Sequence, residues 1–369
     1  MSLGAVMLDI AGKELTDEDR QLLQHPAVGG VILFARNYES PKQLADLTAS
    51  IRALRDPPLL IAADQEGGRV QRFRDGFHRL PAAGEYGLWY ELNPTAALRA
   101  AHVIGWLMAA ELQWVGVDYS FAPVLDIDRG MNRAIGDRAF SRDPQTSALL
   151  ATAWMQGARL AGMVSVAKHF PGHGGVSADS HLELPRDERS WETLWQEDLV
   201  PFQYLIQQGV EAVMPAHIVF PAVDTLAAGF SARWLQDILR QRMGFQGVII
   251  SDALDMLGAA TMGDDVTRAK AALVAGCDQL LACNNRQAAI RIVEGLASLT
   301  PSASQARLLR LYNRRNFNTA SPASLLQPYL HHPYWVEAEQ ILVQMDTLRA
   351  ERATVANTYD PTTRGGRIV

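Results

Sequence analysis

The chain has 369 residues, of which 48% are hydrophobic and 20% are charged, and its formal net charge is −6. This composition is typical of a soluble globular enzyme, and it lacks the excess of basic residues by which nucleic-acid-binding proteins hold phosphates. No apolar stretch reaches the roughly 18 residues that a membrane-spanning helix needs. We therefore expect neither a nucleic-acid partner nor a membrane partner.

The N-terminus and the cysteines both indicate the cytoplasm. Residues 1–10 have no basic segment, and Asp9 interrupts their apolar run, so we expect no secretory signal there. Cys277 and Cys283 are too few for a disulfide framework, and neither lies in a CxxC motif. We predict two reduced thiols in a cytoplasmic protein.

Short apolar runs with the length of buried strands recur along the chain. They cover Ala5–Ile10, Gly30–Phe34, Leu59–Ala63, Ser120–Ile127, Val164–Ala167, Ala212–Ala216, Gly247–Ile250 and Gln279–Ala282. Segments with helical periodicity lie between them: Pro41–Leu54, Pro94–Gln113, Pro144–Leu160, Trp191–Gln208, Ala232–Arg242 and Asp265–Ala275. This alternation predicts an α/β fold, a single (β/α)8 TIM-like barrel, in preference to an open doubly wound sheet.

The pattern weakens near Asn313, and we place the end of the barrel domain at residue 315. Residues 316–369 would form a C-terminal appendage that is helical over Trp335–Arg352 and packs on the barrel or on a partner. Its last residues, 360–367, contain too few apolar side chains to be buried, so we expect them to be disordered.

Polar residues collect where the predicted strands end, which is where (β/α)8 enzymes hold their catalytic groups. They are Asp64, Asp126, Asp128, Lys168, His169, His217, Ser251 and Asp252. Asp and Ser are also favoured as helix N-caps, and for Asp126 and Asp128 that structural role is at least as good an interpretation. For Asp252 we favour a function.

Residues 168–181 contain three of the nine histidines of the chain, together with Lys168 and Asp179. His169 and His173 have the spacing of two zinc ligands on one helical face, but Pro171 and Gly172 between them prevent that helix. A metal site on an irregular loop, formed by His169, His173, Asp179 and His181, remains open, as does a purely structural role of the loop. We interpret the segment as a reactive loop that follows the fifth strand, in which Gly174 and Gly175 permit movement.

The pairing of Asp252 with this loop suits glycoside hydrolysis. A carboxylate delivered by a strand can attack an anomeric carbon, and the departing sugar oxygen then needs a proton donor. His181 titrates near neutral pH, and Asp179, two residues earlier, can orient its ring and stabilise the imidazolium. This interpretation needs no metal and no cofactor.

Sugar recognition requires side chains that bind hydroxyl and carbonyl oxygens. Residues 64–72, with the sequence DQEGGRVQR, supply Asp64 as an acceptor for two neighbouring hydroxyls and a Gly-Gly pair that allows close backbone approach. Arg138 is a further candidate, although a salt bridge with Asp137 or Asp143 would explain it equally well.

Four motifs in this order resemble the family 3 glycoside hydrolases, over about residues 3–315. They are DQEGGRV (64–70), KHFPGHG (168–174), ADSH (178–181) and GFQGVIISD (244–252). Within the family, the chain is most similar to the bacterial cytoplasmic β-N-acetylglucosaminidases of peptidoglycan recycling. The resemblance implies that Asp252 is the nucleophile, that His181 is the acid/base with Asp179 as its dyad partner, and that the sugar is bound by further residues. Those are Asp64, Arg72, Arg138, Lys168 and His169.

By the same resemblance, the enzyme would remove a terminal β-1,4-linked N-acetylglucosamine from 1,6-anhydro-N-acetylmuramic acid with retention of configuration. We expect a monomer whose only partner is this small sugar substrate. Gly175 and Ala253 depart from relatives that carry acidic residues there. A metal-dependent hydrolase and a catalytically silent sugar-binding barrel are the alternatives, and a phosphorylase that uses phosphate in place of water is not excluded.

Overall fold

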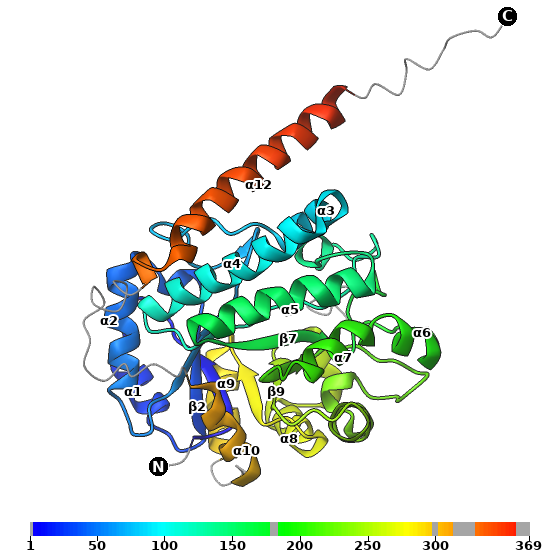
Figure 1. The fold of residues 1–369 in the computed structure, drawn as a ribbon. Coiled ribbons are helices and arrows are strands. Elements are labelled where there is room, and N and C mark those ends of the chain that lie inside the picture. Colours follow the sequence, from blue (N-terminus) through cyan, green and yellow to red (C-terminus); the bar gives the residue numbers. More distant parts are fainter. Residues whose placement is uncertain (1–2, 178–183, 297–301, 313–328, 359–369) are drawn as a thin grey trace, which may run out of the picture.

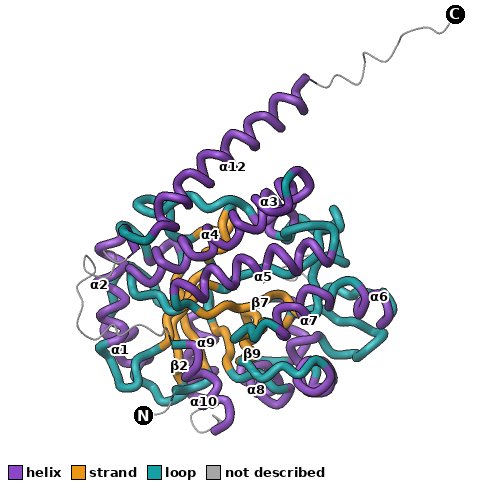
Figure 2. Tube along the Cα trace, in the orientation of Figure 1, coloured by secondary structure: helices purple, strands orange, loops and turns teal. Residues whose placement is uncertain are grey.

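The computed structural model describes residues 3–177, 184–296, 302–312 and 329–358 (Figure 1). Within these residues, parallel strands close into a barrel surrounded by helices (Figures 1 and 2). The strands follow one another around the barrel as β1 (Val6–Asp9), β2 (Val28–Leu33), β3 (Leu60–Ala63), β6 (Tyr119–Ser120), β7 (Val164–Phe170), β8 (Ala212–Pro215), β9 (Val248–Ala253) and β10 (Gln279–Ala282). The predicted (β/α)8 barrel is confirmed, and each predicted strand contributes to it.

Three strands differ from the prediction by more than one residue at their carboxyl ends, and one of them is β9, which runs on to Ala253 and not only to Ile250. The fourth was expected over Ser120–Ile127, but β6 ends at Ser120, and beyond it only an isolated bridge pairs Val124 with Lys168. Pro123 lacks the N–H that a ladder requires, which explains the early end. The fifth strand, β7, runs on to Phe170 because Lys168 and Phe170 pair with β8. Lys168 and His169 therefore lie on the strand itself and not on the loop where we had placed them.

The larger helices agree with the periodicity. They are α2 (Pro41–Arg52), α4 (Pro94–Trp114), α5 (Pro144–Ala161), the π-helical segment η4 (Arg233–Arg242) and α8 (Asp265–Ala275). Proline occupies the first turn of α2, α4 and α5, each behind a capping side chain, namely Ser40, Asn93 or Asp143. The predicted helix over Trp191–Gln208 is instead two helices, α6 (Trp191–Gln196) and α7 (Leu199–Gln207). Asp198, between them, binds Arg129 and Arg189.

Some shorter elements were not predicted. They are α1 (Asp17–Leu23), α3 (Ala83–Leu92), α9 (Arg286–Gly295), α10 (Ser302–Leu308), the short 3-10 turns η1 (Ala35–Asn37), η2 (Gly136–Arg138), η3 (Ala228–Phe230), η5 (Leu257–Met262) and η6 (Leu309–Leu311), and an antiparallel hairpin of β4 (Gln65–Gly67) and β5 (Val70–Gln71). The hairpin matters most for function, because it follows β3 at the carboxyl end of the barrel and carries several polar side chains.

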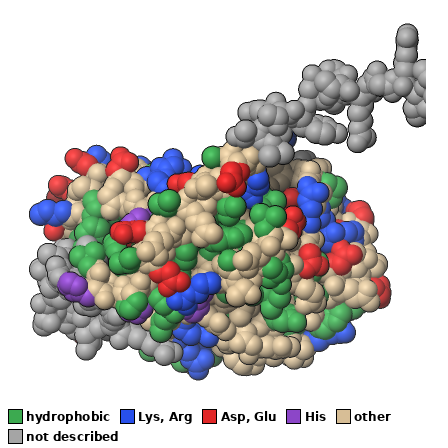
Figure 3. Space-filling model, turned by 45° about the horizontal axis from the view of Figure 1, so that its top comes forward, with side chains coloured by type: hydrophobic (Ala, Val, Ile, Leu, Met, Phe, Trp, Pro, Cys, Tyr) green, Lys and Arg blue, Asp and Glu red, His purple; other side chains and the backbone are tan. Residues whose placement is uncertain are grey.

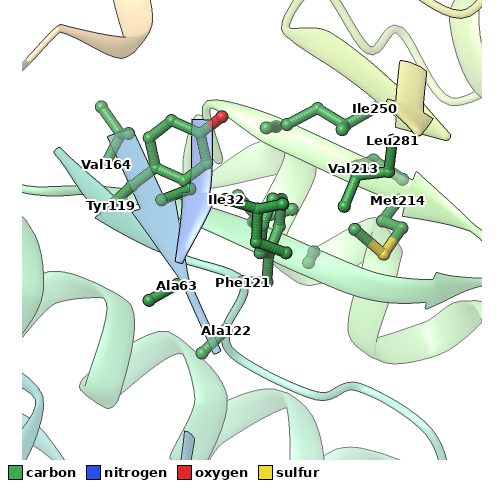
Figure 4. Packing of buried hydrophobic residues seen from close by; sticks show 14 of the residues in the cluster. Ile32, Ala63, Tyr119, Phe121, Ala122, Val164, Val213, Met214, Ile250 and Leu281 are labelled. Atoms are coloured by element: carbon green, nitrogen blue, oxygen red, sulfur yellow. The ribbon is translucent and has the colours of Figure 1, made fainter. Parts of the chain in front are cut away.

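The barrel interior is filled by large apolar side chains. Tyr119, Phe121, Ile32, Met214 and their neighbours pack against one another across the strands (Figure 4). Such layers make the barrel a packed core and not a pore. The strand ends above this core are therefore held rigidly, which suits a site that needs fixed geometry.

The C-terminal appendage contains one long helix, α12 (Pro333–Thr358), which starts on α4 and projects away from the barrel (Figure 1). The guanidinium of Arg99 donates to both carboxylate oxygens of Glu337 at 2.6 Å, and Ala338 is fully buried. The helix is longer at both ends than the predicted Trp335–Arg352. The tail over 360–367 that we expected to be disordered lies outside the described residues.

Acidic and basic side chains are interspersed over the face of the molecule in Figure 3. In the described part of the chain, no helix has the length and apolar character required to cross a bilayer.

Candidate active site

A cavity of about 370 Å³ opens at the carboxyl ends of the strands. Its polar lining comes from Asp64, Glu66, Arg72, Arg138, Lys168, His169 and Asp252, and its apolar lining includes Phe34, Val70, Phe121 and Met214. Every described residue that we predicted to touch a sugar or to attack it is in this lining. Residues that lie far apart in the sequence thus converge because each follows or ends a neighbouring strand.

Asp64 joins two of the predicted binding cations. Its carboxylate accepts from Nη2 of Arg72 at 2.8 Å and from Nζ of Lys168 at 3.0 Å. Burial acts to raise the pKa of Asp64, but the positive charges of Lys168 and Arg72 outweigh it and hold that pKa well below the ordinary value. Asp64 is therefore a fixed anion that can accept hydrogen bonds from hydroxyl groups.

Glu66 is a cavity residue that the sequence analysis did not single out. Its carboxylate accepts a bidentate pair from Nε and Nη2 of Arg138, both at 2.8 Å, and lies 2.7 Å from Nζ of Lys168. The suggested salt bridges of Arg138 to Asp137 or Asp143 were wrong. Asp137 binds Arg69, and Asp143 caps α5.

His169 is held by a buried carboxylate. Its Nδ1 lies 2.6 Å from Oδ2 of Asp126, while Oδ1 of Asp126 accepts the backbone N–H of His173 at 2.7 Å. Asp126 is thus not a helix N-cap, and neither is Asp128, which accepts the backbone N–H of Gly130 at 2.9 Å. The predicted functional alternative fits Asp126, whereas Asp128 stabilises a turn.

His173 has a structural environment, which fits the structural alternative that the sequence left open for this loop. Its Nδ1 lies 2.9 Å from Nδ2 of Asn132, an amide that also donates to the carbonyl oxygens of His173 and Val176. Burial lowers the pKa of His173. The Asn132 side chain therefore connects the segment that precedes Arg138 to the segment that follows β7.

Asp252 lies near the end of β9 and faces the cavity. Its Oδ1 accepts the backbone N–H of Ala253 at 2.8 Å, and the carbonyl oxygen of Ala253 lies 3.1 Å from Nε2 of His217. His217 is fully buried and stacks on Phe230 with ring centroids 5.1 Å apart. The strand-end histidine thus contacts the backbone beside Asp252.

The predicted acid/base pair, Asp179 and His181, lies outside the described residues. The glycines that precede it are tightly packed, because a Cβ on Gly174 would lie 1.9 Å from the carbonyl oxygen of Ile127 and one on Gly175 would lie 2.1 Å from Nη2 of Arg189. Close approach to a backbone atom requires glycine at position 174, whereas a Cβ at position 175 would meet the end of the Arg189 side chain. We had predicted these residues for their mobility, which the packing does not test.

The metal alternative rested on His169, His173, Asp179 and His181. In the described segments of the chain, no group of three or more His, Cys, Asp or Glu side chains is arranged to hold a metal ion. The two described histidines present their rings edge to face with centroids 5.9 Å apart, and each has a protein partner at Nδ1.

The roles of Glu66, which lines the cavity, and of Asp126, which binds the lining residue His169, were missed for different reasons. Glu66 stands in the same motif as Asp64, and alternation along the hairpin was a possible signal, but its partner Arg138 is 72 residues away. Asp126 was noticed but could not be separated from a cap, since its partners are more than 40 residues away. The pairing is set by the barrel and not by local sequence.

A (β/α)8 barrel whose strand ends bring carboxylates and cations to a cavity of sugar size is the architecture of many glycoside hydrolases. The comparisons with known proteins define the family. Residues 3–311 match the family described as "Glycosyl hydrolase family 3 N terminal domain". The chain belongs to glycosyl hydrolase family 3.

Curated relatives match over most of their length. A β-hexosaminidase of Methylobacillus flagellatus is 52% identical over 316 residues, which is 86% of this chain and 90% of the relative. A β-hexosaminidase of Thioalkalivibrio sulfidiphilus is 53% identical over 315 residues, 85% of this chain and 90% of the relative.

Among solved structures, NagZ from Neisseria gonorrhoeae in complex with N-trifluoroacetyl-D-glucosamine has a TM-score of 0.86 and 43% identity, covering 94% of this chain and 98% of that chain. A family 3 β-N-acetylglucosaminidase from Paenibacillus has a TM-score of 0.77 and 31% identity, covering 88% of this chain and 66% of that one.

Proposed function

We propose that the protein is a retaining exo-β-N-acetylglucosaminidase that forms a covalent glycosyl ester on Asp252. The observation that carries this proposal is the placement of Asp252 in one cavity with an ionised Asp64 and the cations Arg72, Lys168 and Arg138. A nucleophile and a set of hydroxyl- and carbonyl-binding groups are what glycosyl transfer to an enzyme carboxylate requires.

The relatives support the sugar specificity. Two of them are named β-hexosaminidases, and the Neisseria NagZ structure was solved with N-trifluoroacetyl-D-glucosamine. We infer that this chain accepts an N-acetylglucosamine unit, held by Asp64, Arg72, Arg138, Lys168 and His169. His169 presents Nε2 to the sugar, because its Nδ1 is bound by Asp126.

The reaction has two steps in this proposal. An oxygen of Asp252 attacks the anomeric carbon, the bond to the departing sugar oxygen breaks, and protonated His181 gives that oxygen its proton. A water molecule then gives a proton to His181 and its oxygen attacks the anomeric carbon, which releases the Asp252 carboxylate. Two inversions give net retention. Asp179 would orient His181 and stabilise its charged form.

We extend the proposal to the natural substrate as follows. The enzyme would release a terminal β-1,4-linked N-acetylglucosamine from 1,6-anhydro-N-acetylmuramic acid, with or without its peptide, in the cytoplasmic recycling of peptidoglycan, and it would act as a monomer. The similarity to NagZ supports this assignment.

A series of 4-nitrophenyl glycosides tests the proposal. The N-acetyl-β-glucosaminide should be hydrolysed, with and without EDTA and with and without phosphate, while β-glucoside and α-linked substrates should be poor. Asp252→Ala should lose at least about 10⁴-fold in kcat, because no nucleophile is left. Asp46→Ala, which changes an exposed aspartate on α2, is the control.

Three outcomes would refute parts of the proposal. Full activity of Asp252→Ala would exclude the assigned nucleophile. Loss of activity in EDTA together with stoichiometric zinc in the purified protein would favour the metal-dependent alternative. Formation of a sugar 1-phosphate in phosphate buffer would identify a phosphorylase.

A further inference from the structure

Glu66 connects two of the cations that line the cavity, Arg138 and Lys168. Its side chain is 8% exposed, and each of its oxygen atoms is engaged. Oε1 lies 2.8 Å from Nη2 of Arg138 and 2.7 Å from Nζ of Lys168, while Oε2 accepts from Nε of Arg138 at 2.8 Å. A single carboxylate thus contacts residues that come from two different loops or strands.

These contacts limit what Lys168 can offer to a ligand. An ammonium group has three N–H donors. Within the described part of the chain, Nζ of Lys168 donates to Oδ1 of Asp64 at 3.0 Å and forms an ion pair with Oε1 of Glu66 at 2.7 Å. The ammonium group is therefore held between two carboxylates, and both of them set its position in the cavity.

The same reasoning applies to Arg138, whose guanidinium has five N–H donors. Counting the described residues only, Nε and one Nη2 hydrogen bond to Glu66, and one Nη1 hydrogen bonds to the carbonyl oxygen of Ala134 at 3.0 Å. Two donors, one on each terminal nitrogen, remain for a ligand.

The contacts of Glu66 with Arg138 and Lys168 form a clamp. The position of Arg138 depends on this clamp more than the position of Lys168 does. Lys168 is part of β7, whereas Arg138 ends the short turn η2 in the long connection between β6 and α5. Among the residues described, Ala134 is the only other hydrogen-bond partner of the guanidinium, and it belongs to the same connection. Glu66 is what ties the guanidinium to the hairpin on the barrel.

We propose that Glu66 is a positioning residue that determines which N–H donors of Arg138 face the sugar and where the ammonium group of Lys168 lies. This inference rests on the proposed function, because it concerns the same cavity. Glu66 acts through the two cations and sets the directions in which acceptor oxygens of the substrate are bound.

The charge state of Glu66 supports this role. Burial acts to raise the pKa of Glu66, but Lys168 and Arg138 outweigh it and lower that pKa to about 2. The carboxylate of Glu66 is therefore ionised over the whole pH range in which the enzyme would work. Charge-assisted, bidentate contacts of this kind are the geometrically most restrictive pairs available to arginine.

The test is a double-mutant cycle on kcat/KM for 4-nitrophenyl N-acetyl-β-glucosaminide, with Glu66→Gln, Arg138→Lys and the double variant. Glu66→Gln should lower kcat/KM by about 10- to 100-fold, chiefly through a rise in KM. Because both substitutions break the same clamp, the double variant should lose at least fivefold less than the product of the two single losses.

Glu85→Gln is the matched control. Glu85 on α3 likewise accepts from one arginine through both oxygens, at 2.8 and 2.7 Å from Nη2 of Arg349, but it lies outside the cavity. It should change kcat/KM by less than twofold, and the loss in kcat/KM of the double variant Glu85→Gln with Arg138→Lys should equal the product of the two single losses. The proposal is wrong if Glu66→Gln changes kcat/KM by less than twofold, or if its double variant with Arg138→Lys also loses the full product of the single losses.

Two further measurements keep the outcome interpretable. If Glu66→Gln does not fold, Glu66→Asp replaces it, since aspartate keeps the charge but is one methylene too short for all three contacts. A folded Glu66→Asp with wild-type kcat/KM would overturn the proposal. If the wild-type protein hydrolyses no glycoside, the proposed function has failed, and calorimetric binding of N-acetylglucosamine to wild type and Glu66→Gln then tests the clamp alone, with a tenfold rise in Kd expected.

Discussion

Oδ2 of Asp126 lies 2.6 Å from Nδ1 of His169, and both residues are almost completely buried. Burial acts to raise the pKa of Asp126, but His169 and His173 outweigh it, so that pKa lies below its ordinary value. The carboxylate is therefore ionised and accepts a hydrogen bond from the N–H at Nδ1. This fixes the tautomer of His169 and leaves Nε2 as the ring nitrogen that can contact a ligand in the cavity.

Asp126→Asn should impair the enzyme by allowing the other tautomer of His169. An amide can donate to Nδ1, in which case the proton moves to Nε2 and the ring offers a donor where it had offered an acceptor. We expect kcat/KM to fall about 10- to 100-fold. Steady-state kinetics measure this, with Asp128→Asn as the control, since Asp128 does not line the cavity and binds only the backbone N–H of Gly130 and the side chain of Arg142 among the described residues. Equal kinetics for the two variants would contradict the role of Asp126.

His78 should make the attachment of α12 depend on pH. Its Nδ1 lies 2.8 Å from Oε1 of Glu111 on α4, and its Nε2 lies 3.9 Å from Glu339 on α12. The hydrogen bond to Glu111 raises the pKa of His78 above its ordinary value near 6.5, although burial opposes this. A raised pKa gives stability that is fully present below about pH 6.5 and is lost as the pH rises through the folded-state pKa.

The measurement for His78 is the thermal midpoint between pH 5.5 and 9, compared with that of His78→Gln. The wild type should lose its advantage over the variant as the pH rises, and hydrogen exchange in residues 333–352 should accelerate in parallel. A difference between the two proteins that does not change with pH would show that His78 contributes no protonation-linked stability.

The appendage should contribute to stability through its buried face. Ala338 is 0% exposed where α12 packs on α4, so Ala338→Glu would bury an unpaired charge. We expect a loss of about 2–4 kcal/mol in the free energy of unfolding, while kcat stays near the wild-type value because the cavity is not lined by this helix. Val343→Glu, at a position that is 69% exposed, is the control and should unfold like the wild type. If both variants are equally stable, α12 is only loosely attached.

The sequence predicted the barrel well because each strand is a continuous apolar run buried on both faces, a signal that is local. It also predicted that Asp64, Lys168 and Asp252 lie at one end of the barrel, since the carboxyl ends of parallel strands share an edge. It did not predict that Glu66 would bind Arg138 or that Asp126 would bind His169. Each of these pairings depends on which acidic side chain lies within reach of the cation or ring in the folded protein. The distance between two residues along the chain does not predict this.

Gly174 should be intolerant of any side chain because the backbone passes too close to its neighbour. A Cβ there would lie 1.9 Å from the carbonyl oxygen of Ile127, a backbone atom that cannot swing away, so Gly174→Ala must displace the chain just before Asp179 and His181. A displacement of about 1 Å in catalytic groups costs on the order of 100-fold. We expect a loss of this size in kcat for the 4-nitrophenyl substrate, with a smaller change in KM because Asp64 and Arg72 are untouched. Gly12→Ala is the control, since nothing lies within 4 Å of its added Cβ. Wild-type kcat in Gly174→Ala would show that the position of this turn does not govern the chemistry.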